Sequence, residues 1–183
     1  IEQLHLFEKD FFEAKTIEKS ENIEFLFQLK NGLAHPISKL SYNISRSTHK
    51  LDLKISASEP ISIKIRANQT LHPENIVGLG GLYNGTSLIS FSPEGIEKMK
   101  QASILNDSER LWHGARSRFW SFLISPSETV QSYSINEIET NSNSFALNSN
   151  SESGEYHFIF YFGPIERSAL ISVSSQLKDL LYT

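Results

Sequence analysis

Residues 51–66 have the sequence LDLKISASEPISIKIR, and this stretch decides the fold class of the chain. On both sides of Ser58-Glu59-Pro60, apolar side chains occupy every second position, and charged or hydroxyl side chains lie between them. Successive side chains of a strand point to opposite faces, so this alternation predicts two strands that are each buried on one face. The Ser-Glu-Pro turn between them predicts a hairpin of an antiparallel sheet.

The same period of two recurs along most of the chain and predicts further strands. Outside the opening stretch, the expected strands are 23–29, 40–44, 87–91, 119–125, 129–138 and 155–162. The last of these is the most hydrophobic, and Asn31-Gly32 after the first is the strongest signal of a two-residue hairpin turn. Residues 139–154 are rich in Asn and Ser and predict an exposed loop that a short strand at 145–147 interrupts.

The C-terminal residues follow the helical period instead. Gly163-Pro164 ends the last predicted strand, and proline is well tolerated at the first helical position because its missing N–H would have no partner there. Apolar residues line one face at helical spacing: Ile165, Ala169, Leu170, Val173, Leu177, Leu180 and Leu181. Residues 1–17 suit either a helical face or short strands. The sequence therefore predicts a single, mostly antiparallel β domain over 1–183, closed by one helix at 164–182.

The composition supports a folded domain and disfavours several kinds of partner. The chain has 183 residues, of which 39% are hydrophobic and 11% aromatic, so it can bury a sizeable core. Its 17 basic and 21 acidic residues give a net charge of −4 without a run of either sign, which argues against nucleic acid as a partner. No stretch approaches the roughly 20 apolar residues of a membrane span. The chain begins at Ile1 without a start methionine, so we expect a longer parent protein.

The sequence contains no assembled motif for catalysis, metal binding or cofactor binding. It has no cysteine, and its six histidines are scattered without the spacing that would direct two imidazoles at one metal ion. Gly78-Leu79-Gly80-Gly81 lacks the third glycine of a dinucleotide loop and the Lys-Ser/Thr of a P-loop, and no G-x-S-x-G elbow is present. We therefore expect no catalytic residue, no metal and no cofactor, and we do not expect an enzyme.

Residues 112–120, with the sequence WHGARSRFW, are the strongest candidate for a binding surface. They place two indoles and two guanidiniums near the start of a predicted strand. One interpretation is core aromatic residues beside solvated arginines. The other is a binding edge, because Trp and Arg are enriched at interface hot spots. Both interpretations stay open, and the candidate partner-binding residues of this segment are Trp112, Arg116, Arg118 and Trp120.

Residues 118–126, with the sequence RFWSFLISP, and the later Phe160-Tyr161-Phe162-Gly163-Pro164 resemble the periplasmic domain of the YidC family of membrane protein insertases. In that family a segment of the type W-x-G-x-(K/R)-x-(R/K)-Y-F-x-x-x-(L/I)-I-P precedes a strand that ends in Y-x-G-P. The residues that match in order are Trp112, Gly114, Arg116, Arg118, Phe119 and Ile124. The chain departs from the pattern at Trp120, where the family has a smaller aromatic residue, and at Ser125.

The resemblance extends over roughly residues 22–182 and implies a fold, a location and a function. The implied fold is an antiparallel β-sandwich of the β-supersandwich kind, with galactose-mutarotase-like architecture and a C-terminal α-helix that leads toward a transmembrane span. The implied location is the bacterial inner membrane, with this domain in the periplasm. The implied function is non-catalytic: the domain assists insertion and folding of inner-membrane proteins by docking Sec translocon components and nascent membrane proteins.

The C-terminal helix adds two candidate partner-binding residues, Leu177 and Leu181, because the resemblance places this helix next to the membrane. Two other classes of function remain open. One is a carbohydrate-binding sandwich module with Trp112 and Trp120 as stacking platforms, and the other is a mutarotase-like sugar enzyme, since fold alone does not decide function.

Overall fold

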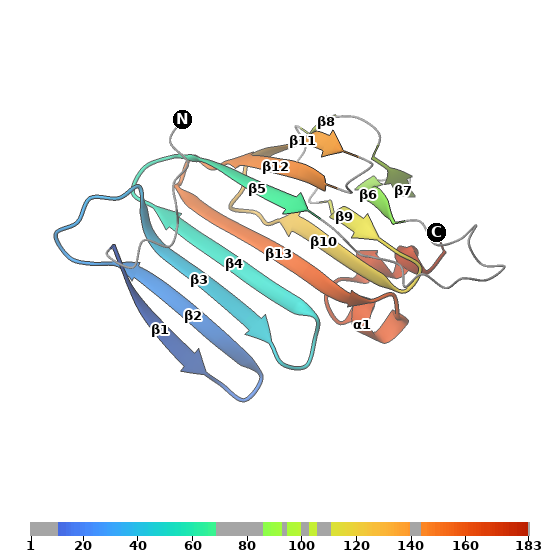
Figure 1. Cartoon of the computed structure of the whole chain (residues 1–183), viewed down its shortest axis with the longest axis horizontal. Helices are drawn as coiled ribbons and strands as arrows, with labels where there is room; N and C mark the ends of the chain where they lie inside the picture. Colours follow the sequence, from blue (N-terminus) through green and yellow to red (C-terminus); the bar gives the residue numbers. More distant parts are fainter. Residues whose placement is uncertain are drawn as a thin grey trace.

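The computed structural model describes residues 11–68, 86–92, 95–99, 103–105, 111–139 and 144–182, which form two antiparallel sheets and a C-terminal helical segment (Figure 1). The larger sheet has the strand order β1-β2-β3-β4-β13-β10-β9-β6-β7, and the smaller sheet has the order β5-β12-β11-β8. The larger sheet comprises β1 (Phe12–Glu18), β2 (Asn22–Leu29), β3 (Ile37–Ser45), β4 (Lys50–Ala57), β6 (Ser87–Ser92), β7 (Gly95–Lys98), β9 (His113–Arg116), β10 (Trp120–Pro126) and β13 (Glu155–Pro164). The smaller sheet comprises β5 (Ser62–Asn68), β8 (Ser103–Leu105), β11 (Ser132–Glu139) and β12 (Ser144–Asn150). The predicted mostly β, antiparallel fold is confirmed.

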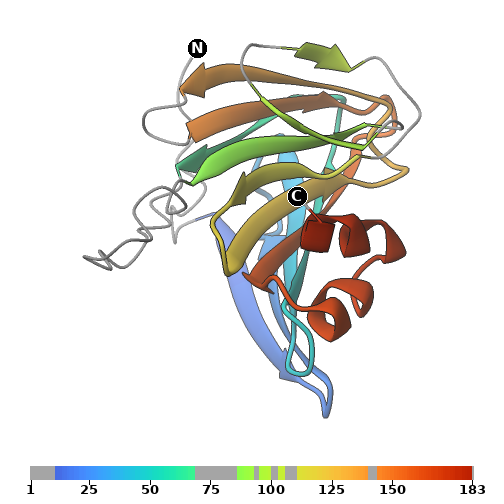
Figure 2. The ribbon, with the colours of Figure 1, turned by 90° about the vertical axis from the view of Figure 1, so that its right-hand side faces the viewer.

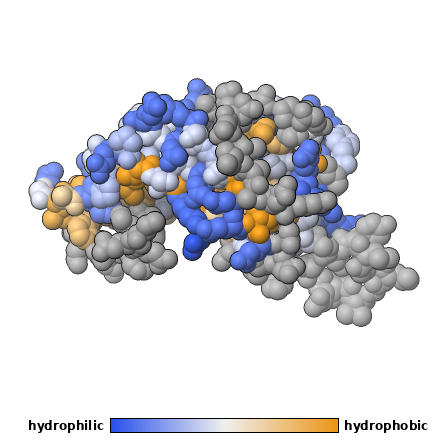
Figure 3. Space-filling view, turned by 90° about the horizontal axis from the view of Figure 1, so that it is seen from above, coloured by the Kyte–Doolittle hydropathy of each residue, from blue (hydrophilic) through white to orange (hydrophobic). Residues whose placement is uncertain are grey.

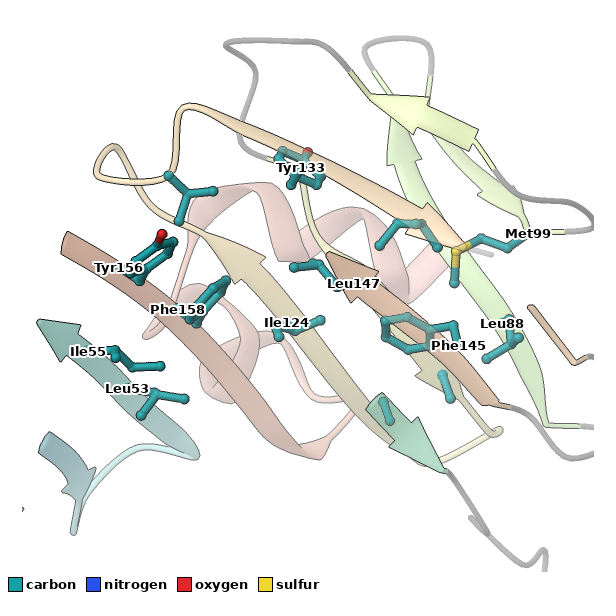
Figure 4. Packing of buried hydrophobic residues seen from close by; sticks show 14 of the residues in the cluster. Leu53, Ile55, Leu88, Met99, Ile124, Tyr133, Phe145, Leu147, Tyr156 and Phe158 are labelled. Carbon is teal, nitrogen blue, oxygen red and sulfur yellow. The ribbon is translucent and has the colours of Figure 1, made fainter. Parts of the chain in front are cut away.

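The two sheets enclose the main hydrophobic core. Alternate side chains of β3, β4, β13 and β10 point to the face of the larger sheet that packs on the smaller one, and we call this the inner face. Figure 4 shows Leu53, Phe158 and Ile124 of this face opposite Phe145 and Leu147 of β12. Phe158, Ile124 and Leu147 are completely buried, as expected of interdigitated sheet faces.

The hairpin predicted between 51–57 and 61–66 is wrong, although both strands exist. β4 pairs with β3 and β13 in the larger sheet, whereas β5 pairs with β12 in the smaller one. The Ser58-Glu59-Pro60 turn therefore carries the chain from one sheet to the other. Ile61 directly after the turn is held by Tyr156 of β13: its N–H donates to the phenol oxygen at 3.1 Å, and the phenol donates to its carbonyl. Alternation determines faces but leaves the pairing partner open.

Two other local predictions also fail for identifiable reasons. In the described part of residues 139–154, the predicted short strand at 145–147 is present but is longer and not exposed: β12 lies between β5 and β11, and Phe145, Ala146 and Leu147 are buried. Its Asn and Ser residues are compatible with a strand because a buried hydroxyl can find a backbone acceptor, as Ser149 does at Ile63 (3.2 Å). Asn31-Gly32 forms no two-residue hairpin, since β3 begins only at Ile37, after a proline that cannot donate to the ladder.

The continuous helix predicted over 164–182 is replaced by α1 (Arg167–Ile171) and the 3₁₀ helix η2 (Ser175–Tyr182). Pro164 belongs to β13, where it pairs with Trp120. Two serine hydroxyls bond to the backbone at the break: Ser172 donates to the Ala169 carbonyl at 2.6 Å, and the Ser174 hydroxyl accepts the Gln176 N–H at 3.3 Å. Such bonds compete with the regular helical pattern.

The C-terminal segment, α1 and η2, covers the outer face of the larger sheet, opposite the inner face. Figure 2 shows it against β13 and β10, with β1 and β2 extending away from it. Leu177 and Leu180, three residues apart as a 3₁₀ helix requires, are both buried in a second core with Leu170, Leu123 and Tyr161. The predicted apolar face is thus present, although the helix is broken. The glycine cluster at 78–81 lies outside the described residues.

Candidate binding groove

The inner face of the larger sheet is closed at one end and open at the other. Along β13, Phe158 is completely buried, Phe160 is half-buried and Phe162 is 53% exposed. Along β10, Ile124 is completely buried, whereas Trp120 is 45% exposed. These residues share a face because they are two apart on each strand and because Phe160 pairs with Ile124 and Phe162 with Phe122. The apolar side chains of the core therefore continue along these strands beyond the region that the smaller sheet covers, where they are exposed.

The open end holds a groove of about 450 Å³. Its apolar lining residues come from four neighbouring strands: Tyr42, Ile44, Leu51, Phe122, Phe160 and Phe162. Its polar lining residues all come from the β3–β4 connection and its borders: Ser45, Thr48, His49 and Lys50. The groove thus has an apolar floor and a polar wall at one end only.

Aromatic rings form a continuous row along this floor. Phe122 lies 6.0 Å from Phe160 and 6.3 Å from Phe162, measured between ring centroids. Trp120 lies 5.9 Å from Phe162 and 6.5 Å from His49. Rings at such distances make favourable edge-to-face or tilted contacts. A row of this kind offers a firm apolar surface to an incoming chain.

Lys50, a charged residue of the groove wall, is already engaged with Asp52, which alternation places on the outer face of β4 together with His157 of β13. Asp52 Oδ2 lies 3.1 Å from Lys50 Nζ, and its Oδ1 lies 2.8 Å from His157 Nε2. Burial raises the pKa of Asp52, but hydrogen bonds from His157 and Lys50 outweigh that effect and hold the pKa below its ordinary value. This carboxylate is therefore a poor general base. Among the described residues, no group of three His, Asp or Glu side chains is arranged to hold a metal ion.

Packing explains why the glycines of the sequence motif are needed next to the groove. A Cβ atom on Gly114 would collide with the backbone of Phe122 in the neighbouring strand β10. A Cβ atom on Gly163 would lie only 2.6 Å from the ring of His49, which covers this point of β13. The two glycines thus permit close approach, one between β9 and β10 and the other under the β3–β4 connection.

The six predicted partner-binding residues lie in three different environments. Trp112 and Leu177 are buried in the second core. Arg116 and Leu181 are half-buried, and the Arg116 guanidinium donates to the Leu180 carbonyl at 3.3 Å, which fastens η2 to β9. Only Arg118 and Trp120 are exposed, so the core interpretation fits Trp112 and the surface interpretation fits Trp120.

Sequence reasoning missed the residues that form most of the groove, above all Tyr42, Leu51, Phe160 and Phe162. Their alternation was visible and led to their assignment as core residues. Alternation carries no information about where the covering sheet ends, because that depends on the length and position of strands far away in the sequence.

His113 is a completely buried titratable group, and its role is structural. Its Nδ1 lies 2.9 Å from the Ser90 hydroxyl, and its Nε2 lies 3.3 Å from the Tyr133 hydroxyl. Burial lowers the pKa of His113 to about 3. A serine beside a histidine resembles a nucleophile and its base, but His113 is fully inaccessible. The arrangement therefore links β9, β6 and β11 within the core.

No helix in the described part of the chain has the length and apolar character that crossing a membrane requires. No family model matches the chain, and no curated protein matches its sequence. Among solved structures, the chain is similar to the crystal structure of a galactose mutarotase-like protein from Clostridium acetobutylicum, with 9% sequence identity and a TM-score of 0.38. The similarity covers 82% of this chain and 65% of that protein.

Proposed function

We propose that this chain is a non-catalytic, extracytoplasmic domain of a YidC-type membrane protein insertase, located on the periplasmic side of the bacterial inner membrane. In this proposal the groove on the inner face holds an extended apolar segment of a client protein before or during its insertion. The observation that carries the binding role is the row of half-open aromatic residues that continues the core. The resemblance of residues 112–126 and 160–164 to the family motif supports the proposed family and its location at the inner membrane.

The chemistry of the groove favours an apolar polypeptide over a sugar. A sugar ring presents hydroxyl groups on all sides, and its binding site needs several converging hydrogen-bond partners. Here the polar lining is confined to the β3–β4 connection, and Lys50 is paired with Asp52. Trp112, one of the two proposed stacking platforms, is buried in the second core. Among the described residues, this groove therefore offers a sugar few hydrogen-bond partners, which favours the polypeptide proposal over the carbohydrate-binding and mutarotase-like alternatives.

The family part of the proposal makes a direct prediction about the parent gene. Its reading frame is expected to encode a membrane span before Ile1 and several spans after Thr183. A reading frame that encodes a secreted protein without membrane spans would remove the insertase setting and leave only the binding role.

The binding role can be tested in cells that produce the full-length protein. A photo-crosslinking amino acid at Ile44, which is 38% exposed on the groove, is expected to crosslink to nascent inner-membrane proteins or to Sec translocon subunits. Leu33 provides a matched control, because it is 41% exposed but lies in the β2–β3 connection, at the opposite end of β3. Equal crosslinking from both positions, or none from Ile44, would contradict the proposal.

A further inference from the structure

At the rim of the groove, the outermost rings of the aromatic row adjoin a further exposed ring, Phe119. Phe119 is 59% exposed at the tip of the β9–β10 connection, and Trp120 and Phe162 adjoin it on β10 and β13. The start of the C-terminal segment is fastened to the same rim, because the Ile165 N–H donates to the Phe119 carbonyl at 2.7 Å. Large apolar side chains therefore gather where strand ends, the hairpin tip and the C-terminal segment meet. By contrast, the face seen in Figure 3 is mainly hydrophilic over its described residues, with apolar side chains in separate small areas.

One arginine lies against these aromatic residues, and a second lies on the adjoining C-terminal chain. Arg118 lies with its Cζ 5.2 Å from the centroid of the Phe119 ring, and Arg167 follows two residues after Ile165. Neither forms an ion pair with a residue in the described ranges, whereas Arg46 pairs with Glu18 and Arg66 with Glu137. Glu166 contributes one negative charge beside Arg167. The rim thus combines exposed rings with two cations that are free to bind an anion.

We infer that this rim, formed by Arg118, Phe119, Trp120, Phe162 and Arg167, docks on the surface of an anionic lipid bilayer. Aromatic rings prefer the boundary between headgroups and acyl chains, and guanidiniums complement the phosphates above them. Phe119 protrudes at a hairpin tip, which suits shallow insertion into a yielding surface better than enclosure in the pocket of a rigid partner. The inference depends on the proposed function for its biological setting, and it would turn the mouth of the groove toward the membrane.

The two tryptophans allow a direct test with the unmodified chain. Trp112 is buried in the second core, so a change in emission on adding vesicles reports Trp120. Vesicles of phosphatidylcholine and phosphatidylglycerol are expected to shift the emission to shorter wavelength, and lipids brominated near the headgroup end of the acyl chain are expected to quench it. Vesicles of phosphatidylcholine alone are expected to give a weaker response, because they lack net negative charge.

Variants at the rim assign the contribution of each residue. Phe119→Ser is expected to weaken vesicle binding about tenfold, and Arg118→Gln about fivefold with anionic vesicles only. Leu33→Ser and Arg66→Gln are matched controls away from the rim and should bind vesicles as the unmodified chain does. Circular dichroism would confirm that each variant is folded.

The inference would be overturned by vesicles that leave Trp120 emission unchanged, or by equal binding of Phe119→Ser and Leu33→Ser. If Phe119→Ser removed crosslinking to a client protein while vesicles had no effect, the rim would be a protein contact. Loss of vesicle binding with normal crosslinking from Ile44 would remove this inference alone. Normal vesicle binding without crosslinking from Ile44 would instead remove the proposed role of the groove.

Discussion

The two faces of the β10–β13 pair carry similarly apolar side chains but differ in how far other parts of the chain cover them. On the outer face, Leu123 and Tyr161 are completely buried beneath the C-terminal segment. On the inner face, Trp120 and Phe162 of the same two strands lie about half exposed. A short segment of chain suffices to close one face, so the fold does not lack the means to cover apolar surface. Open apolar surface carries an aggregation risk, and its presence here is consistent with the proposed contact with a client protein or membrane.

The largest effect is expected on the closed outer face. Leu177→Ala should lower the free energy of unfolding by about 2–5 kcal/mol, because it removes a completely buried side chain and leaves a cavity. Leu181→Ala is the matched control: Leu181 is half-buried, and the loss should stay under about 1 kcal/mol. Urea unfolding followed by circular dichroism measures both values. Equal losses would mean that η2 is held as a whole and that the comparison between buried and half-buried residues fails.

The second largest effect is a loss of stability in acid, and it involves His113 in the covered part of the inner face. His113 has an ordinary pKa of 6.5 when unfolded and a pKa of about 3 when folded. Below pH 6.5 the unfolded chain therefore binds a proton that the folded chain does not, and stability should fall by up to about 1.4 kcal/mol per pH unit until pH approaches 3.

His113→Gln, which keeps hydrogen-bonding capacity but does not titrate in this range, should remove this part of the pH dependence. The measurement is urea unfolding of both proteins between pH 7 and 5. An unchanged slope in the variant would show that carboxylates, not His113, cause the loss of stability in acid.

The third effect separates binding from folding on the open half of the inner face. Phe162→Ser should change the free energy of unfolding by about 1 kcal/mol or less, because the ring is already half exposed. The same change should weaken binding of a Leu- and Phe-rich peptide at least about tenfold, since it interrupts the aromatic row of the groove. Fluorescence of Trp120, 5.9 Å from Phe162 in the unmodified chain, provides the titration signal. A large stability loss with unchanged peptide binding would make this half of the face structural.

The smallest effect is expected when sugars or divalent metal ions are added, because neither should bind. Simple sugars and divalent metal ions should leave the melting temperature unchanged, whereas a ligand at 100 times its Kd would add about 2.7 kcal/mol of stability. Differential scanning fluorimetry with galactose, glucose and the common divalent ions is sufficient. A reproducible rise with one sugar would favour the carbohydrate-binding or mutarotase-like alternative and refute the interpretation of the groove as a polypeptide site.

Much of this protein could be predicted from the sequence because strand alternation is a local property. The existence of β4, β5 and β13 and the side chains that each buries followed from residues two apart, and the apolar side of the C-terminal segment followed from helical spacing. Local signals failed where a competing local interaction or a distant partner decided the outcome. The predicted helix is interrupted where the hydroxyls of Ser172 and Ser174 bond to the backbone, and the Asn- and Ser-rich residues 144–150 form a strand between β5 and β11.

The sequence by itself determined the fold class and the two-faced character of the strands. Only the tertiary structure decided that β4 and β5 belong to different sheets, that Trp112 is buried while Trp120 is exposed, and that the inner face opens beyond Phe160. The reason is physical: a strand's own residues specify which side chains share a face. Whether that face is covered depends on how far a second sheet, assembled from distant segments, extends over it.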